Sequence, residues 1–322
     1  MLIIFLSFTM SGCSKEGQGN EGVSKNDQSY LPAFNIESGA PELIAVHPRL
    51  TSGALSHAKL MKLSEGVLIR TEKLIFTRND IDAELNKMPP EQKDLYSKNQ
   101  FLIADQLATG AILEQEAKAE MSGKGMDVSA MDQNMLLQTW IGGKVSDITV
   151  TEEETKKFYE ENKDLIGGAP YEQVKGQINS YLAQEKQQDA VQQLVKELGK
   201  RIDIAVDADW AKEQDAIGRD NEVDRARDSG KPTMANFGAD SCVPCQQMKP
   251  IREAVKEKYE GKVNVVYVHA DKEQMVSTRY GIRGIPHLIF FDSKGNVFHE
   301  QTGVMTEEQI EDLLIKMAVE KI

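Results

Sequence analysis

Two cysteines separated by two residues are the clearest chemical feature of the sequence. Cys242 and Cys245 follow a β-prone stretch at residues 233–237 and precede a helix-prone stretch at residues 248–259. A cysteine at a helix N-terminus meets unpaired N–H groups and the positive end of the helix dipole, which favour thiolate over thiol. A thiolate attacks disulfides, and a second cysteine one turn on can attack the mixed disulfide and release the substrate. The pattern predicts that Cys242 attacks and Cys245 resolves.

A zinc site is the alternative interpretation of this spacing, because half of such a site has the same C-x-x-C pattern. Zinc would need two further nitrogen or sulfur ligands. The remaining candidates, His269, His287 and His299, are scattered along the sequence. We therefore expect no metal and no cofactor, and a redox-active Cys242–Cys245 disulfide instead.

Composition excludes several classes of function. The length of 322 residues suggests two domains. With 40% hydrophobic and 28% charged residues, the composition fits a folded protein and excludes a polytopic membrane protein. A net charge of -13 disfavours a nucleic-acid partner, because the phosphate backbone is also negative. Three cysteines are too few for a disulfide-stapled scaffold.

The last hundred residues alternate short strands with helices, which indicates an α/β domain with a parallel or mixed sheet. The pattern predicts strands at residues 233–237, 263–268, 288–291 and 297–301 and helices at 221–228, 248–259, 272–280 and 306–319.

Residues 222–322 resemble thioredoxins. The matching motifs are F-G-A-D-S-C-V-P-C at 237–245 and Y-G-I-R-G-I-P at 280–286. The resemblance implies a thioredoxin fold in which Pro286 is a cis-proline beside the disulfide. It also implies that Ile285 pairs with an incoming substrate strand, and that Val243 and Pro244 contact the substrate.

Three departures from that family pattern concern the chemistry. Asn236 stands where thioredoxins usually bury an aspartate near the second cysteine, so we expect resolution by Cys245 to be slower or to rely on water. Ser241 stands where thioredoxins commonly have an aromatic residue, directly before the first cysteine. Pro244 stands where strongly oxidising members of the DsbA type carry histidine, which predicts a weaker oxidant. Reductase or isomerase activity is favoured, and outside the cytoplasm it would need a membrane thiol-electron donor.

The middle of the chain is predicted to be mainly helical with a small β hairpin. We expect the hairpin at residues 64–77 and a strand at 202–206 that returns to it. Asn79 is expected to cap a helix through Leu85, and Thr151 to begin a capping box. Further helices are predicted around residues 101–112, at 129–141 and from Pro170 to residue 199. The buried face of the first is expected to hold Phe101, Ala104, Leu107, Ala108, Ala111 and Ile112. The buried positions of the last are expected to be Tyr171, Val174, Ile178, Leu182, Leu194, Val195 and Leu198.

Residues 64–210 resemble the N-terminal chaperone module of the SurA and PrsA foldases, in the stretches at 66–85, 113–121 and 150–164. The parvulin domain that usually follows the last stretch is absent here. No histidine lies between His57 and His269, which disfavours prolyl isomerase activity. The resemblance implies a helical cradle for unfolded polypeptide; the alternative is a bundle that only spaces the C-terminal domain from a membrane.

The N-terminus looks like an export signal. Residues 2–8 are apolar but far fewer than the about 20 needed to span a bilayer as a helix. Met10-Ser11-Gly12-Cys13 resembles the lipobox of bacterial lipoproteins, which implies a signal peptide at 1–12 and a lipidated Cys13. A polar tether and a short helix at 52–63 would complete residues 13–63. The alternative is a cytoplasmic protein with an apolar N-terminus.

Three functions remain open on these observations. The favoured one is a periplasmic or otherwise extracytoplasmic, membrane-anchored thiol-disulfide oxidoreductase that acts on unfolded or disulfide-bearing protein clients. The second is a holdase chaperone that uses the thioredoxin fold mainly as a docking surface. The third is a dedicated reductant of apocytochrome thiols.

Overall fold

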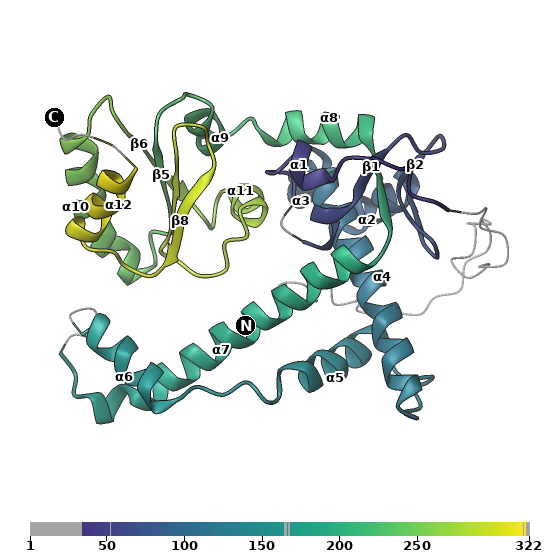
Figure 1. Cartoon of the computed structure of the whole chain (residues 1–322), viewed down its shortest axis with the longest axis horizontal. Helices are drawn as coiled ribbons and strands as arrows, with labels where there is room; N and C mark the ends of the chain where they lie inside the picture. The colour runs from purple at the N-terminus through teal and green to yellow at the C-terminus, as the bar shows by residue number, and fades with distance from the viewer. Residues whose placement is uncertain (1–33, 52, 164–165, 167, 318, 320–322) are drawn as a thin grey trace. The chain divides into compact units, whose positions relative to one another are not determined.

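The computed structural model describes residues 34–51, 53–163, 166, 168–317 and 319 (Figure 1). The predicted signal peptide, Cys13 and most of the tether lie outside the described residues. The chain divides into two compact units. The first comprises Met1–Pro48, Gly53–Tyr159 and Pro170–Ala211, and the second comprises Lys212–Ile322 with Arg49–Ser52 and Glu160–Ala169.

The first unit contains a sheet of four short strands in the order β1-β4-β2-β3, with bounds β1 Lys59–Met61, β2 Val67–Thr71, β3 Ile75–Thr77 and β4 Ile204–Asp207. Strands β2 and β3 form the predicted antiparallel hairpin, and β4 returns to pair antiparallel with β2. The predicted helix at 52–63 is wrong: a 3-10 turn, Ala54–His57, leads into β1, which pairs parallel with β4. Burial of Leu60 and Met61 against the sheet explains the strand.

Seven helices are described in the first unit before β4: α1 Leu43–Val46, α2 Arg78–Lys87, α3 Pro90–Ser97, α4 Gln100–Gly123, α5 Gln133–Val145, α6 Glu152–Glu161, whose last residues pass into the second unit, and α7 Tyr171–Arg201. The capping box at Thr151 is confirmed, because its hydroxyl accepts from the Glu154 N–H and the Glu154 carboxylate accepts from the Thr151 N–H. At α2 the prediction of Asn79 as cap is wrong. Thr77 caps this helix in a reciprocal pair with Asp80.

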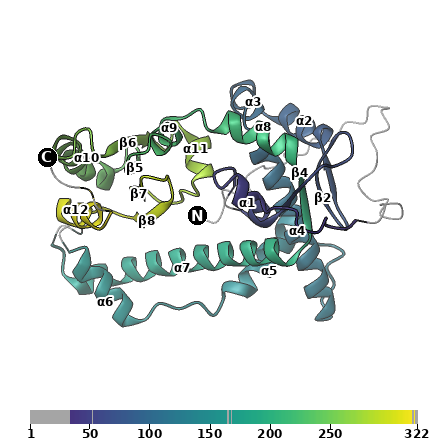
Figure 2. The same cartoon turned by 45° about the horizontal axis from the view of Figure 1, so that its top comes forward.

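Helices α4, α5 and α7 share an apolar core that includes Leu136, Trp140 and Leu198. Figure 2 shows α5 alongside part of α7. The predicted buried side of α7 is largely wrong, since only Ile178 and Leu198 of those positions are buried. On α4 the predicted face holds except at Leu107 and Ala111, which are half-buried. Most of α7 therefore keeps its apolar side chains only half-covered within this chain.

The second unit is an α/β domain built on a sheet in the order β6-β5-β7-β8, with bounds β5 Thr233–Gly238, β6 Asn264–His269, β7 His287–Phe291 and β8 Val297–Thr302. Strand β6 runs parallel to β5, whereas β7 and β8 are antiparallel to their neighbours. The predicted mixed sheet is confirmed. Its helices are α9 Glu222–Arg227, α10 Val243–Lys258, α11 Gln274–Arg279 and α12 Glu307–Lys316, and α8 Ala208–Gly218 precedes them across the boundary between the units.

The two faces of this sheet are covered by different helices, and alternate residues of its central strands pack against each. Met234 and Leu288 pack with residues of α10 and α12, whereas Ala235 and Phe237 pack with residues of α9 and α11. Because side chains alternate along a strand, Asn236 and Gly238 must face the α10 side together with Met234. This alternation brings β5 residues beneath the helix that carries the cysteines.

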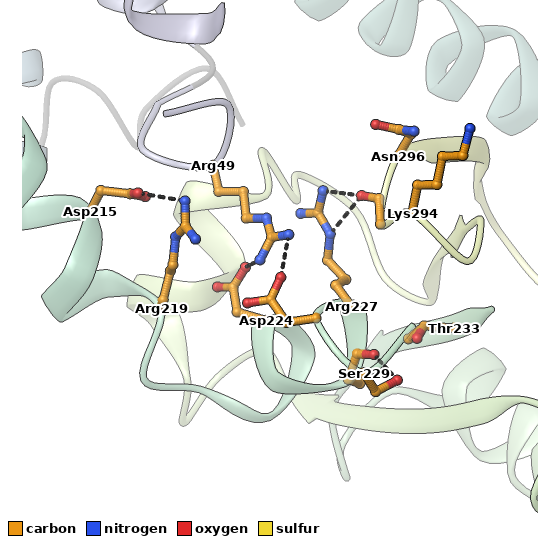
Figure 3. A network of polar contacts seen from close by, with 12 residues as sticks. Arg49, Asp215, Arg219, Asp224, Arg227, Ser229, Thr233, Lys294 and Asn296 are labelled. Carbon is orange, nitrogen blue, oxygen red and sulfur yellow. Dashed lines mark hydrogen bonds and ion pairs between the residues drawn. The ribbon is translucent and has the colours of Figure 1, made fainter. Parts of the chain in front are cut away.

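A cluster of arginines around α9 connects Arg49 to this domain. Arg49 donates hydrogen bonds to Asp224 at 3.0 Å and Asp228 at 2.8 Å, and Figure 3 shows it reaching Asp224. The Asp224 carboxylate is fully buried and also accepts from the Tyr280 hydroxyl and from Arg279. Burial raises the pKa of Tyr280, and the neighbouring Asp224 raises it further. Arg49 and Arg279 thus share one buried anion.

Within the described part of the chain, no helix is both long enough and apolar enough to cross a membrane.

Candidate redox site

Cys242 and Cys245 are joined by a disulfide at the start of α10. Cys242 is the N-cap residue, and its Sγ accepts the backbone N–H of Cys245 at 3.2 Å. The helix begins at Val243, earlier than predicted, and Pro244 is tolerated there because the first-turn N–H groups have no partner in the helix. Cys242 is partly exposed and Cys245 is 4% exposed. Only the first sulfur is therefore accessible to a substrate.

The loop before β7 lies against the disulfide. The Ile285–Pro286 peptide bond is cis, as the thioredoxin resemblance implies. The carbonyl oxygen of Ile285 lies 3.8 Å from the Cys242 Sγ. Pro286 is buried, while Val243 on the first turn of α10 is 69% exposed. The structure thus places Ile285 and Pro286 beside Cys242, and leaves Val243 and Pro244 exposed.

His287, which follows the cis-proline, is half-buried within the sheet. It lies on β7, an inner strand, and its Nδ1 is 2.9 Å from the Thr302 hydroxyl. Burial lowers the pKa of His287, so the neutral ring is favoured. Its packing is sufficient to explain its presence.

Three polar side chains, Asn236, Arg252 and Tyr267, lie together on the α10 face of β5 and β6, and only Asn236 was singled out from the sequence. Asn236 is 1% exposed, and its side-chain oxygen accepts a hydrogen bond from Arg252 of α10 at 3.1 Å. The guanidinium of Arg252 lies over the ring of Tyr267, 4.0 Å from its centroid. Asn236 and Tyr267 are register partners on β5 and β6, which is why they share this face. Neither Arg252 nor Tyr267 was a predicted site residue.

Two opposing effects act on Tyr267. Burial raises the pKa of its hydroxyl, whereas the Arg252 cation lowers it. Burial also lowers the pKa of Arg252, and Tyr267 opposes that change. At neutral pH the tyrosine is therefore protonated and the arginine charged, since the ordinary pKa of a guanidinium lies far above neutral. The cluster of Asn236, Arg252 and Tyr267 therefore carries one positive charge, and the acidic group that acts on Arg252 is Glu253.

The loop above the disulfide is charged but solvent-facing. Asp240 pairs with Lys272 at 3.2 Å and lies 3.8 Å from the His269 Nδ1. Over the described ranges, no three His, Cys, Asp or Glu side chains are grouped to hold a metal ion. The redox group that this geometry offers is the disulfide.

Comparisons with known proteins locate the same domain. The family model for thioredoxin-like domains matches residues 219–318. Thioredoxin 1 of Nostoc sp. is 41% identical over 64 residues, which are 20% of this chain and 60% of the relative. Thioredoxin of Pseudomonas aeruginosa is 33% identical over 79 residues, 24% of this chain and 72% of the relative.

A third relative has a longer chain. It is the thiol:disulfide interchange protein TxlA homolog of Synechocystis sp., 36% identical over 80 residues, which are 24% of this chain and 44% of the relative. This chain therefore spans less than two thirds of the Nostoc and Synechocystis proteins. The family match at residues 219–318 includes Cys242 and Cys245. Through this domain the chain belongs to the thioredoxin family.

Proposed function

We propose that the protein exchanges disulfides in protein substrates, with Cys242 as nucleophile and Cys245 as resolving cysteine. The observation that carries this proposal is the asymmetry of the pair: a partly exposed Cys242 at a helix N-terminus is bonded to a buried Cys245. The helix dipole and the Cys245 N–H favour a thiolate on Cys242. The name of the Synechocystis relative, a thiol:disulfide interchange protein, supports the same chemistry.

The direction of electron flow in this proposal is reductive or isomerising. Pro244 places no positive side chain between the cysteines, so the dithiol form is not over-stabilised by a charge at that position. Ile285 and Pro286 would align an extended substrate strand beside Cys242, and Val243 would contact its side chains. Electrons would come from a membrane thiol donor.

The proposed setting is a lipoprotein outside the cytoplasm, anchored through Cys13. The first unit would act as a SurA/PrsA-like module that holds an unfolded client near the disulfide. Support for the module comes from its hairpin, from the return of β4 to β2, and from α7, whose apolar side chains are largely half-covered. In this proposal the SurA/PrsA-like module comprises residues 64–210 and the thioredoxin domain comprises residues 222–322.

Turnover of a protein disulfide tests the function directly. The experiment uses the chain with Cys13→Ser, dithiothreitol as reductant and insulin as substrate, and follows precipitation of the reduced insulin chains. We expect catalysis that Cys242→Ser abolishes, and a mixed disulfide that accumulates with Cys245→Ser. The matched control is Cys13→Ser alone. Insulin reduction no faster than dithiothreitol alone would overturn the proposal.

The holdase alternative is separated from this function by one further variant. A Cys242→Ser/Cys245→Ser chain should still suppress client aggregation if the first unit binds polypeptide, but it should fail wherever disulfide exchange is required. Full cellular function without either thiol would favour the holdase.

A further inference from the structure

The resolving cysteine has no acidic partner in the position where the thioredoxin resemblance places one. To resolve a mixed disulfide, Cys245 must lose its proton. Its thiolate then donates an electron pair to the Cys242 Sγ, the Cys242–Cys245 bond forms, and the bond from Cys242 to the substrate sulfur breaks. The substrate leaves as a thiolate and takes a proton from water. Asn236 cannot take the proton of Cys245, so another feature must favour the thiolate.

The hydroxyl of Tyr267 is the polar group placed to do so. A Cβ built on Gly238 would lie 3.0 Å from the Tyr267 hydroxyl oxygen and 3.2 Å from the Cβ of Cys245. The hydroxyl and Cys245 therefore flank one small site, which is open only because residue 238 has no side chain. The Nδ2 of the buried Asn236 has no hydrogen-bond partner among the described residues, so a second donor is available on this face.

Arg252 supplies the charge for this arrangement. It lies two turns beyond Cys245 on α10, and helical side chains lean toward the helix N-terminus, which directs its guanidinium back beneath the cysteine. There it is held by the oxygen of Asn236 and by the face of Tyr267. A cation over an aromatic face is an attractive pair, and here it makes the tyrosine hydroxyl a stronger donor.

We propose that Tyr267 and Arg252 replace the buried acid: the Tyr267 hydroxyl donates a hydrogen bond to the Cys245 thiolate, and the Arg252 cation strengthens that bond. Both are positioning residues for the resolving step. This inference rests on the proposed function, because it assigns a means of resolution to the same disulfide.

Other charged groups also surround Tyr267 and Cys245. From the loop after β5 comes Asp240, which is paired with Lys272 and lies near His269. From α10 itself comes Glu253, which is exposed. The ring of His269 packs against Tyr267 with 4.8 Å between centroids, and Asp271 and Lys272 also act on the Tyr267 hydroxyl. Asp240 is 72% exposed at its side chain, so solvent screens it more than Arg252.

Titration of Cys245 tests the inference. In a chain with Cys13→Ser and Cys242→Ser, Cys245 is the sole thiol, and the ¹³Cβ chemical shift of labelled cysteine reports its ionisation even though it is buried. We expect Tyr267→Phe to raise its titration midpoint by about one pH unit, a tenfold loss of thiolate below the midpoint, as loss of a hydrogen bond to a charged group predicts. Arg252→Met should raise it similarly, and Arg252→Lys should restore most of the difference.

Matched controls separate this effect from general perturbation. Tyr181→Phe removes an exposed tyrosine hydroxyl in the first unit, and Arg225→Met removes an exposed arginine of α9; neither should move the midpoint. A midpoint unchanged by both Tyr267→Phe and Arg252→Met would overturn the inference. The titration needs no substrate, so a chain that shows these shifts yet fails to reduce insulin would refute the proposed function and leave this inference standing.

Discussion

Two arginine networks in the C-terminal domain differ in the groups that hold their positive charges. Around α9, Arg49 and Arg279 share the fully buried carboxylate of Asp224 (Figure 3). Arg49 also pairs with Asp228 and Arg279 with Asp215, so the positive charges are compensated. Beneath the disulfide, Arg252 is held by an amide oxygen and an aromatic face instead. Cations that are paired with buried carboxylates produce little electric field outside their cluster. A cation that is held by neutral groups acts more strongly on the groups around it. We infer that the first network stabilises the fold and the second acts on the cysteines.

Removal of the anion from the first network should have the largest effect. Asp224→Asn keeps the shape of the side chain but removes the carboxylate that Arg49 and Arg279 share, and leaves Arg49 with Asp228 and Arg279 with Asp215. We expect a loss of roughly 3–5 kcal/mol in the free energy of unfolding, the range seen when one partner of a buried ion pair is removed. Urea denaturation followed by circular dichroism measures it.

The matched control is Asp220→Asn, which removes the partner of Arg225 from an exposed pair. Surface pairs contribute about 0–1 kcal/mol, so this variant should unfold near the parent. Equal losses for the two variants would contradict the description of Asp224 as the centre of the network.

Loss of the cation from the second network should affect chemistry more than stability. Arg252→Met keeps most of the apolar length of the side chain and removes the charge. We expect resolution of a mixed disulfide to slow about tenfold near neutral pH, which corresponds to one pKa unit, or about 1.4 kcal/mol, at Cys245. Stopped-flow measurement of leaving-thiol release gives the rate. A variant that loses several kcal/mol of stability without slower release would make Arg252 a structural residue.

Making the second network resemble the first sharpens the comparison. Asn236→Asp places a carboxylate at the atom that now accepts from Arg252, so the cation becomes compensated. We expect the titration midpoint of the Cys245 thiol to rise by roughly half to one pH unit, because a compensated Arg252 stabilises the thiolate less. The new carboxylate also supplies the proton acceptor that Asn236 lacks. The rate of resolution should also acquire a pH dependence from the new carboxyl group. A pH profile identical to that of the parent would show that the field of Arg252 does not reach Cys245.

The smallest expected effect is the dependence of stability on acid pH that Asp228 gives to the first network. The hydrogen bond from Arg49 lowers the pKa of Asp228, and burial of the carboxylate opposes this change. The unfolded state then binds more protons, so this stabilisation is complete above the ordinary value of 3.8 and is lost as pH falls through the lower folded value. Asp228→Asn should reduce the loss of urea resistance below about pH 4. Identical acid profiles would remove Asp228 from the network.

The sequence predicted those features that depend on local patterns. The C-x-x-C pair at a strand-helix junction and the Ile285–Pro286 motif are short, and each lies on one segment. The hairpin and its return strand followed from alternating apolar residues. The caps were less certain, because Thr77 and Asn79 are both good capping residues and the reciprocal bond with Asp80 decides between them.

Features that depend on distant contacts were missed. Arg252 and Tyr267 meet only because α10 covers one face of the sheet and β6 pairs in register with β5. Arg49 is far from Asp224 in sequence, and no local pattern predicts that pair. One signal was available: a buried Asn236 within an apolar strand requires a polar partner. The half-covered apolar side of α7 was also unpredictable, since helical periodicity does not say what covers a face.

The reduction potential of the Cys242–Cys245 pair tests the central claim most directly. The chain with Cys13→Ser is equilibrated with glutathione buffers, and its free thiols are counted. We predict a value between those of thioredoxin, about −270 mV, and protein disulfide isomerase, about −180 mV, as expected for a reductase or isomerase. A value near that of DsbA, about −120 mV, would contradict the account and make the pair an oxidant.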